Sequence, residues 1–157
     1  MNTLKAGDNA PLFSLQNQND ETIELKTLLE SNQVLVYFYP KASTPGCTVQ
    51  AENLRNEKAQ LAELNTVSVG ISPDPIKRLK NFETKKELNF DLLSDEDHAI
   101  ADAFGVWGLK KFMGKEYDGI HRISFLVSQD GKIKHVFDKF KTKDHHEVVI
   151  NFLKENT

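Results

Sequence analysis

Several classes of protein are excluded by what this sequence lacks. Its 157 residues include a single cysteine, which cannot close an internal disulfide or build a cysteine-based zinc site. No apolar run approaches the ~18–20 residues that a bilayer-spanning helix needs, and the N-terminus has no basic start followed by an apolar stretch, as a secretory signal has. We therefore expect a cytoplasmic protein with no membrane-inserted part.

Excess positive charge is also absent. The formal net charge is −3, and the basic clusters Lys110-Lys111 and 139–143 are short or interrupted by acids, so we expect no nucleic-acid partner. The 39% apolar and 27% charged content is typical of a soluble globular protein. A chain of this length suits one compact domain, and we expect a single domain over 1–157.

The hydrophobic pattern alternates between strand and helix along the chain. Strands are predicted over 10–16 and 22–25, which form an N-terminal hairpin, and then over 34–39, 66–72, 90–94, 122–128 and 132–137. Helices are predicted over 47–64, 76–86, 94–104 and 148–153. This order predicts an α/β fold with a central mixed β-sheet flanked by α-helices on both faces.

One segment shows no clear period. Residues 106–121 include Gly108, Gly114 and Gly119, follow Gly105, and lack helical or strand spacing, so we expect a long loop there. Downstream, Asp130-Gly131 between two apolar runs is a strong hairpin signal.

The single cysteine, Cys47, stands where an apolar strand runs through a turn into a helix. The unpaired N–H groups and positive dipole end of a helix start favour thiolate over thiol, and the thiolate is the nucleophile. Cys47 is therefore a candidate nucleophile; the alternative is a buried, inert thiol.

The segment Pro40-Lys-Ala-Ser-Thr-Pro-Gly-Cys47 matches the PxxxTxxC signature of the peroxiredoxins. Residues 48–51, 54–55, 69–72 and 119–126 extend the similarity, and the chain resembles the bacterioferritin-comigratory (Bcp, or PrxQ) subfamily along essentially its whole length. This resemblance implies a thioredoxin-like fold and a thiol-dependent peroxidase that reduces hydrogen peroxide and organic hydroperoxides. It implies no metal or organic cofactor.

The resemblance also assigns roles to four residues. Cys47 would be the peroxidatic cysteine, and the Arg122 guanidinium would lie beside its thiolate, the alternative being an ordinary salt-bridging strand arginine. Thr44 would turn its hydroxyl toward the sulfur and the peroxide, or would only cap the helix. Pro40 would shield the sulfur from water, or would only end the strand.

Other side chains are less decisive. Tyr39 is equally compatible with packing in the core and with lining the substrate pocket. Arg55 either supports Arg122 or lies on the exposed surface of the helix. The histidines do not cluster in the sequence, so no metal site is expected.

The chain departs from many subfamily members at Glu52, where they carry a resolving cysteine. The sulfenic acid on Cys47 would then need an external thiol, from thioredoxin, a glutaredoxin-like protein or a low-molecular-weight thiol. Thr44 occupies the first position of a thioredoxin-type C-x-x-C pair, which excludes dithiol exchange. We expect a monomer, with a dimer as the alternative.

Two other function classes remain open. A cysteine hydrolase or transferase would need a histidine base beside Cys47. A non-catalytic redox sensor would use oxidation of Cys47 to change a partner surface, and would be oxidised once without turnover.

Overall fold

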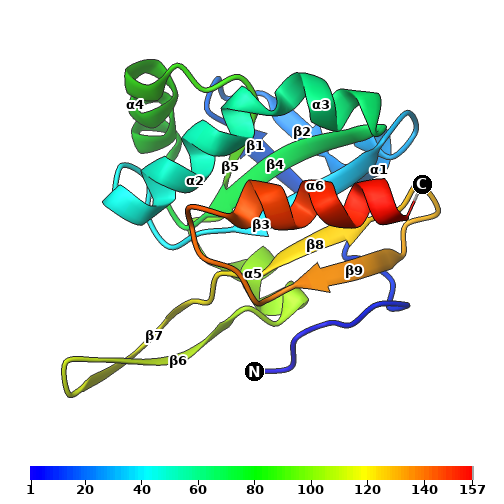
Figure 1. The fold of residues 1–157 in the computed structure, drawn as a ribbon. Coiled ribbons are helices and arrows are strands. Elements are labelled where there is room, and N and C mark those ends of the chain that lie inside the picture. The colour runs from blue at the N-terminus through cyan, green and yellow to red at the C-terminus, as the bar shows by residue number, and fades with distance from the viewer. Residues whose placement is uncertain (157) are drawn as a thin grey trace.

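A seven-stranded mixed sheet forms the centre of the computed structural model, which describes residues 1–156 (Figure 1). The strand order is β2-β1-β5-β4-β3-β8-β9; β3, β4 and β5 run parallel, and the other neighbours are antiparallel. The strands are β1 (Ser14–Asn17), β2 (Thr22–Glu24), β3 (Gln33–Phe38), β4 (Thr66–Ser72), β5 (Asp91–Ser94), β8 (Ser124–Val127) and β9 (Ile133–Phe137). The predicted mixed sheet and N-terminal hairpin are confirmed.

Helices cover both faces of this sheet. The helices are α1 (Leu25–Leu28), α2 (Pro45–Asn56), α3 (Lys58–Glu63), α4 (Ile76–Lys86), α5 (Ala99–Phe104) and α6 (His145–Glu155). Helices α2, α3, α4 and α6 pack on one face, and α1 and α5 on the other. Among residues 1–156, no helix has both the length and the apolar character needed to cross a membrane.

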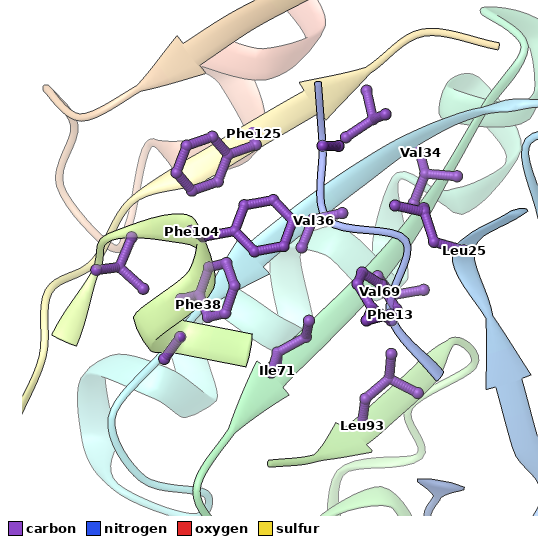
Figure 2. Close-up of a cluster of buried hydrophobic side chains, with 14 of the residues drawn as sticks. Phe13, Leu25, Val34, Val36, Phe38, Val69, Ile71, Leu93, Phe104 and Phe125 are labelled. Carbon is purple, nitrogen blue, oxygen red and sulfur yellow. The ribbon is translucent and has the colours of Figure 1, made fainter. Parts of the chain in front are cut away.

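The alternation of side chains along β3 builds two cores. Val34, Val36 and Phe38 face one side of the sheet, where Figure 2 shows Phe38 among Phe104 and Phe125. Leu35 and Tyr37 face the other side, with the apolar residues of α2, α3, α4 and α6. Because β3 is buried on both faces, its continuously apolar sequence is what a central strand requires.

The expected helix over 47–64 is interrupted in the structure. It comprises α2 and α3, separated at Glu57, whose φ of −102° and ψ of 11° depart from α-helical values. The apolar spacing continues across the break because Leu54 and Leu61 both reach the same core. The apolar periodicity of the sequence therefore did not reveal the break at Glu57.

The prediction of a long loop over 106–121 is wrong. The segment forms an antiparallel hairpin of β6 (Trp107–Phe112) and β7 (Lys115–Ile120), which projects from the body of the molecule (Figure 1). Its turn residues Met113 and Gly114 have φ of 51° and 79°, as a two-residue hairpin loop requires. Most of the hairpin is exposed on both faces, so its sequence shows no apolar–polar alternation.

Candidate active site

Cys47 lies in the first turn of α2, just beyond the end of β3. Thr44 is the N-cap residue and Pro45 occupies the first helical position, where its fixed φ suits the helix and its missing N–H costs nothing. The first helical hydrogen bond joins Thr48 N to Thr44 O at 2.9 Å, so the N–H groups of Gly46 and Cys47 have no helical partner. The Cys47 side chain is buried, with 1% of its surface exposed.

Arg122 brings a permanent positive charge to this sulfur. Its Nη2 lies 3.2 Å from Cys47 Sγ, and its Nη1 donates to Gln50 Oε1 at 3.1 Å. Gly46 makes room for the guanidinium, since a Cβ on Gly46 would lie 3.2 Å from Arg122 Nη2. The arrangement gives the sulfur a planar, charged donor held in place from a second side.

Two features of this arrangement were not predicted from sequence. Arg122 precedes β8, which begins at Ser124, and is therefore not the first residue of a strand. Gln50 was overlooked, although it lies three residues after Cys47 and therefore on the same face of α2. This three-residue spacing is the sequence feature that indicates a position near Cys47.

Thr44 lies at the start of α2 but its hydroxyl does not cap the helix. Thr44 Oγ1 donates to the Lys41 carbonyl at 2.7 Å, and the side chain makes no capping hydrogen bond, so the capping alternative is wrong. The hydroxyl proton is engaged with Lys41, while its oxygen retains lone pairs that accept hydrogen bonds.

The loop that carries Pro40 and Thr44 is anchored by a residue from another element. Asp74 is 3% exposed, and its Oδ2 accepts the Ala42 N–H at 2.7 Å and the Ser72 hydroxyl at 2.8 Å. The last backbone bond before the half-buried Pro40 joins Tyr39 N to Ile71 O. In the sequence, Asp74 stands between Pro73 and Pro75, and no motif singles it out.

Two buried tyrosines pack in the same core as Cys47. The rings of Tyr37 and Tyr39 stack with centroids 5.4 Å apart, and both side chains belong to the core cluster that contains Cys47. Burial holds the pKa of both hydroxyls well above the ordinary value, so they stay neutral. Tyr39 thus packs in the core, in the same cluster as Cys47.

A second basic side chain approaches the site from the β6–β7 hairpin. Lys110 Nζ donates to the Ile120 carbonyl at 2.8 Å, two residues before Arg122. Burial lowers the pKa of Lys110, the positive charge of Arg122 lowers it further, and Cys47 opposes both. The surroundings of the sulfur are therefore rich in positive charge.

No histidine among residues 1–156 hydrogen-bonds Cys47. The buried His145 instead meets the Ser124 hydroxyl through Nε2 at 2.8 Å, and burial lowers its pKa to about 3. In the same described range, no group of three or more His, Cys, Asp or Glu residues is arranged to hold a metal ion. The partner of the thiol is an arginine, which does not act as a base at neutral pH.

Arg55 does not support Arg122, so that alternative is wrong. Its Nη1 donates to the Lys86 carbonyl at 2.7 Å, which ties α2 to the end of α4. Glu52, at the position of the missing resolving cysteine, lies 3.9 Å from the same guanidinium nitrogen.

The comparisons with known proteins all indicate the same protein family. The AhpC/TSA family profile matches residues 6–136. The chain is 59% identical to Peroxiredoxin Bcp of Escherichia coli strain K12 over 156 residues, 99% of each chain.

Two solved structures are similar over nearly their whole length. Peroxidoxin BcpB from Mycobacterium tuberculosis has a TM-score of 0.87 at 31% identity, covering 98% of this chain and 99% of that one. The bacterioferritin comigratory protein of Xanthomonas campestris, in a structure concerned with alkyl peroxide reduction, has a TM-score of 0.86 at 29% identity, covering 95% and 99%.

Proposed function

This chain belongs to the AhpC/TSA family and, within it, to the Bcp/PrxQ peroxiredoxins, which are thiol peroxidases, and we propose that Cys47 is the peroxidatic cysteine of its one-cysteine cycle. The single observation that carries the proposal is the 3.2 Å contact of Arg122 Nη2 with Cys47 Sγ in the first turn of a helix. A sulfur so surrounded is stabilised as the nucleophilic thiolate.

The first half of the cycle is a displacement at oxygen. The Cys47 thiolate attacks the terminal oxygen of the hydroperoxide, the S–O bond forms as the O–O bond breaks, and the electron pair leaves with the hydroxide or alkoxide, which takes up a proton. The sulfur is oxidised to a sulfenic acid, and the peroxide is reduced to water or an alcohol. Arg122 stabilises both the sulfur anion and the charge that develops on the departing oxygen.

Thr44, Pro40 and the first turn of α2 complete the proposed site. With its own proton donated to Lys41, the Thr44 hydroxyl accepts the O–H of the hydroperoxide and orients it. The unpaired N–H groups of Gly46 and Cys47 donate to the peroxide oxygens. Pro40 shields the sulfur from bulk water, so these charges act in a low dielectric.

The second half of the cycle uses an external thiol, because no other cysteine exists in the chain. A thiolate attacks the sulfenic sulfur and expels water to give a mixed disulfide, and a second thiol then regenerates Cys47. Thioredoxin, a glutaredoxin-like protein or a low-molecular-weight thiol supplies these equivalents. We infer that the protein acts as a cytoplasmic monomer whose residues 1–157 form one domain.

Mass spectrometry after peroxide treatment tests the proposal. With stoichiometric hydrogen peroxide and a sulfenic-acid trap, the wild type gains one adduct on Cys47, and Cys47→Ser gains none and consumes no peroxide. Addition of excess dithiol reductant gives many turnovers per protein. A protein that is oxidised once and never turns over would support the redox-sensor alternative, and absence of any adduct on Cys47 would reject both.

A further inference from the structure

We propose that a cavity remote from Cys47 binds a short, uncharged peptide segment in an extended conformation, as an added strand of the sheet. The cavity has a volume of about 440 Å³ and lies between α3, the start of β4 and the β1–β2 turn. None of Cys47, Thr44, Pro40 and Arg122 lines it. Its volume falls within the range of about 300–1,000 Å³ that is usual for small-molecule sites.

One side of the cavity is a strand edge without a neighbour. The ladder between β4 and β5 starts at the pair Val69–Asp91, whereas β4 itself starts at Thr66. Further along β4, the Ser72 carbonyl accepts the Asp95 N–H on the β5 side. Because successive residues of a strand direct their backbone groups to opposite sides, the even-numbered residues of β4 all point toward β5.

It follows that the N–H and C=O of Thr66 and the N–H of Ser68 point to the side where β5 no longer runs. Both residues line the cavity. The Ser68 hydroxyl oxygen is also buried and has no hydrogen-bonding partner within residues 1–156. A peptide that lies extended along 66–68, over about 10 Å, would pair its own N–H and C=O groups with these backbone groups, as in the addition of a strand to an open sheet edge.

The apolar lining of the cavity lies on both faces of the sheet. On the face covered by α1 and α5, the apolar lining residues are Leu28, Val67 and Val69. On the face covered by α2, α3 and α4, they are Leu54, Leu61 and Phe90. The side chains of an extended peptide alternate between the two faces, so a peptide with apolar side chains contacts both walls while its backbone pairs with β4.

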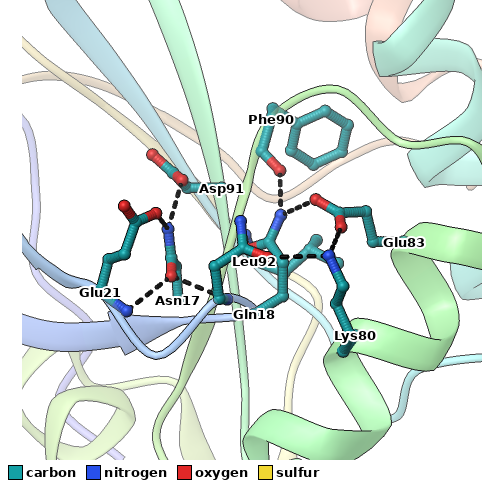
Figure 3. Close-up of polar contacts among 9 residues, drawn as sticks. Asn17, Gln18, Glu21, Lys80, Glu83, Phe90, Asp91 and Leu92 are labelled. Atoms are coloured by element: carbon teal, nitrogen blue, oxygen red, sulfur yellow. Dashed lines mark hydrogen bonds and ion pairs between the residues drawn. The ribbon is translucent and has the colours of Figure 1, made fainter.

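The wall formed by the β1–β2 turn is held in place by two buried side-chain amides (Figure 3). Asn17 Nδ2 donates to Glu21 Oε1 at 3.2 Å and to Asp91 Oδ1 at 3.0 Å. Gln18 Nε2 donates to the Phe90 carbonyl at 3.0 Å. Because these contacts exist before any ligand arrives, the wall is already formed, which lowers the ordering cost of binding.

The charged residues that line the cavity do not favour a charged ligand. Lys58 Nζ donates to the Asn89 carbonyl, and Glu83 pairs with Lys80 at 2.8 Å. The two carboxylates beside Asn17 both accept from its amide. Charges of opposite sign around one cavity weaken its preference for either sign, so recognition rests on backbone hydrogen bonds and apolar contact.

Nuclear magnetic resonance titration of the full chain tests the proposal with three capped tripeptides. The first is acetyl-valyl-alanyl-valine amide, the second is the same peptide with the backbone nitrogen of each of its three residues methylated, and the third is acetyl-triglycine amide. We expect saturable shifts of backbone amides in 17–21, 66–68 and 89–91 with the first peptide. The second lacks the backbone donors and the third lacks the apolar side chains, so each should bind at least about tenfold more weakly.

Two substitutions at one position separate the backbone from the side chain. Ser68→Pro removes an N–H that faces the cavity at an open strand edge, where proline is tolerated, and should weaken the first peptide by about tenfold. Ser68→Ala keeps this N–H and should stay within about threefold of the wild type. A thermal midpoint near that of the wild type would show that the proline variant is folded.

Several results would overturn the proposal: no saturable shifts with the first peptide, equal affinity for the three peptides, shifts confined to other residues, or an unchanged affinity in folded Ser68→Pro. The comparison of the three peptides uses the wild type alone, so it decides the question even if the proline variant does not fold. The readout is binding alone, so it does not depend on peroxidase activity.

Discussion

At the scale of single residues, two arginines that look alike in sequence have different surroundings. Arg122 directs its two terminal nitrogens into the site, Nη2 at Cys47 Sγ and Nη1 at Gln50 Oε1. Arg55, on the helix that carries Cys47, points to the Lys86 carbonyl. Only the first is in a position to stabilise charge on sulfur or oxygen.

Arg122→Gln should therefore slow the reaction of Cys47 with hydrogen peroxide by about 10²–10³-fold, the usual effect of removing one donor to a developing oxyanion. The amide cannot supply the permanent charge that meets the thiolate and the departing oxygen. The second-order rate constant from stopped-flow measurements at neutral pH is the quantity to compare.

Arg55→Gln is the matched control for that substitution, because it removes the same group from the same molecule without touching the sulfur. Its rate constant should stay within about threefold of the wild type, since among residues 1–156 the partners of the Arg55 guanidinium are the Lys86 carbonyl and the side chains of Asn56 and Glu52. A similar loss of rate in both variants would mean that Arg122 acts through stability and not through the site.

At the scale of elements, the two ends of α2 are held by different means. Its last turn is tied to the α4–β5 region, where Arg55 Nη1 donates to Lys86 O and Asn89 Nδ2 donates to Arg55 O at 3.2 Å. Its first turn depends on the packing of Cys47 and on the contact with Arg122. The first turn is therefore the part that opens at lower cost.

Because Cys47 is 1% exposed, an external thiol reaches the oxidised sulfur only if this turn opens. Oxidation to the sulfenic acid should accelerate amide hydrogen exchange in residues 47–51 while leaving 53–56 near the rate of the reduced protein. Exchange followed by nuclear magnetic resonance in both states measures this. Equal exchange rates in the two states across α2 would argue against local opening.

The end of α5 shows how a glycine closes a helix under tertiary constraint. Gly105 has a φ of 75°, and a Cβ there would lie 2.1 Å from the Asn2 carbonyl oxygen. Gly131, in the β8–β9 turn, has a φ of 86° but nothing within 4 Å of a Cβ. Both positions require a positive φ, but they differ in the space available for a side chain.

Gly105→Ala should accordingly lower the free energy of unfolding by several kcal/mol, and Gly131→Ala by only about 1 kcal/mol, the cost of a left-handed conformation for an L-residue. Urea unfolding of both variants gives the comparison. Equal losses would show that the N-terminal segment around Asn2 moves aside at Gly105 without cost.

At the scale of the whole molecule, α6 joins the helical layer to the sheet through a buried histidine. The His145 ring lies between Tyr37 and Phe140, at centroid distances of 5.8 Å and 4.5 Å, and its Nε2 meets Ser124 Oγ. Protonation would place a charge in this apolar region with Arg122 nearby, so the fold favours the neutral ring.

Burial lowers the pKa of His145 from 6.5 to about 3, so the stability that follows from the neutral ring is complete above about pH 6.5 and is lost as pH falls toward 3. The wild type should lose stability steeply between pH 6.5 and 4.5 in urea unfolding. His145→Gln should be less stable at pH 8 but lose less over that interval. Parallel pH profiles for the two proteins would contradict a titrating His145.

Sequence alone identified the parts of this protein that depend on local pattern. The apolar run of β3, the helical spacing of α4 and the end of the 94–104 helix at Phe104 all appeared as predicted. Burial on a known period restricts the residue type, and so does the left-handed backbone of Gly105, which follows that helix. The signature ending at Cys47 indicated the family by itself, since it is a contiguous run of residues. The β6–β7 hairpin was not predicted, because the side chains of an exposed two-stranded ribbon need not alternate between apolar and polar residues.

Tertiary structure decided which distant residues meet. Only the pairing of β3 with β8 brings Arg122 to Cys47 across 75 positions of sequence, and only the β4–α4 turn delivers Asp74 to the Ala42 N–H. Gln50 and Arg55 belong to the same helix, α2. Because α2 packs against both the sheet and α4, Gln50 contacts Arg122 whereas Arg55 contacts the Lys86 carbonyl. Local pattern constrains each residue's own backbone and burial, whereas the identity of its neighbour follows from how the layers pack.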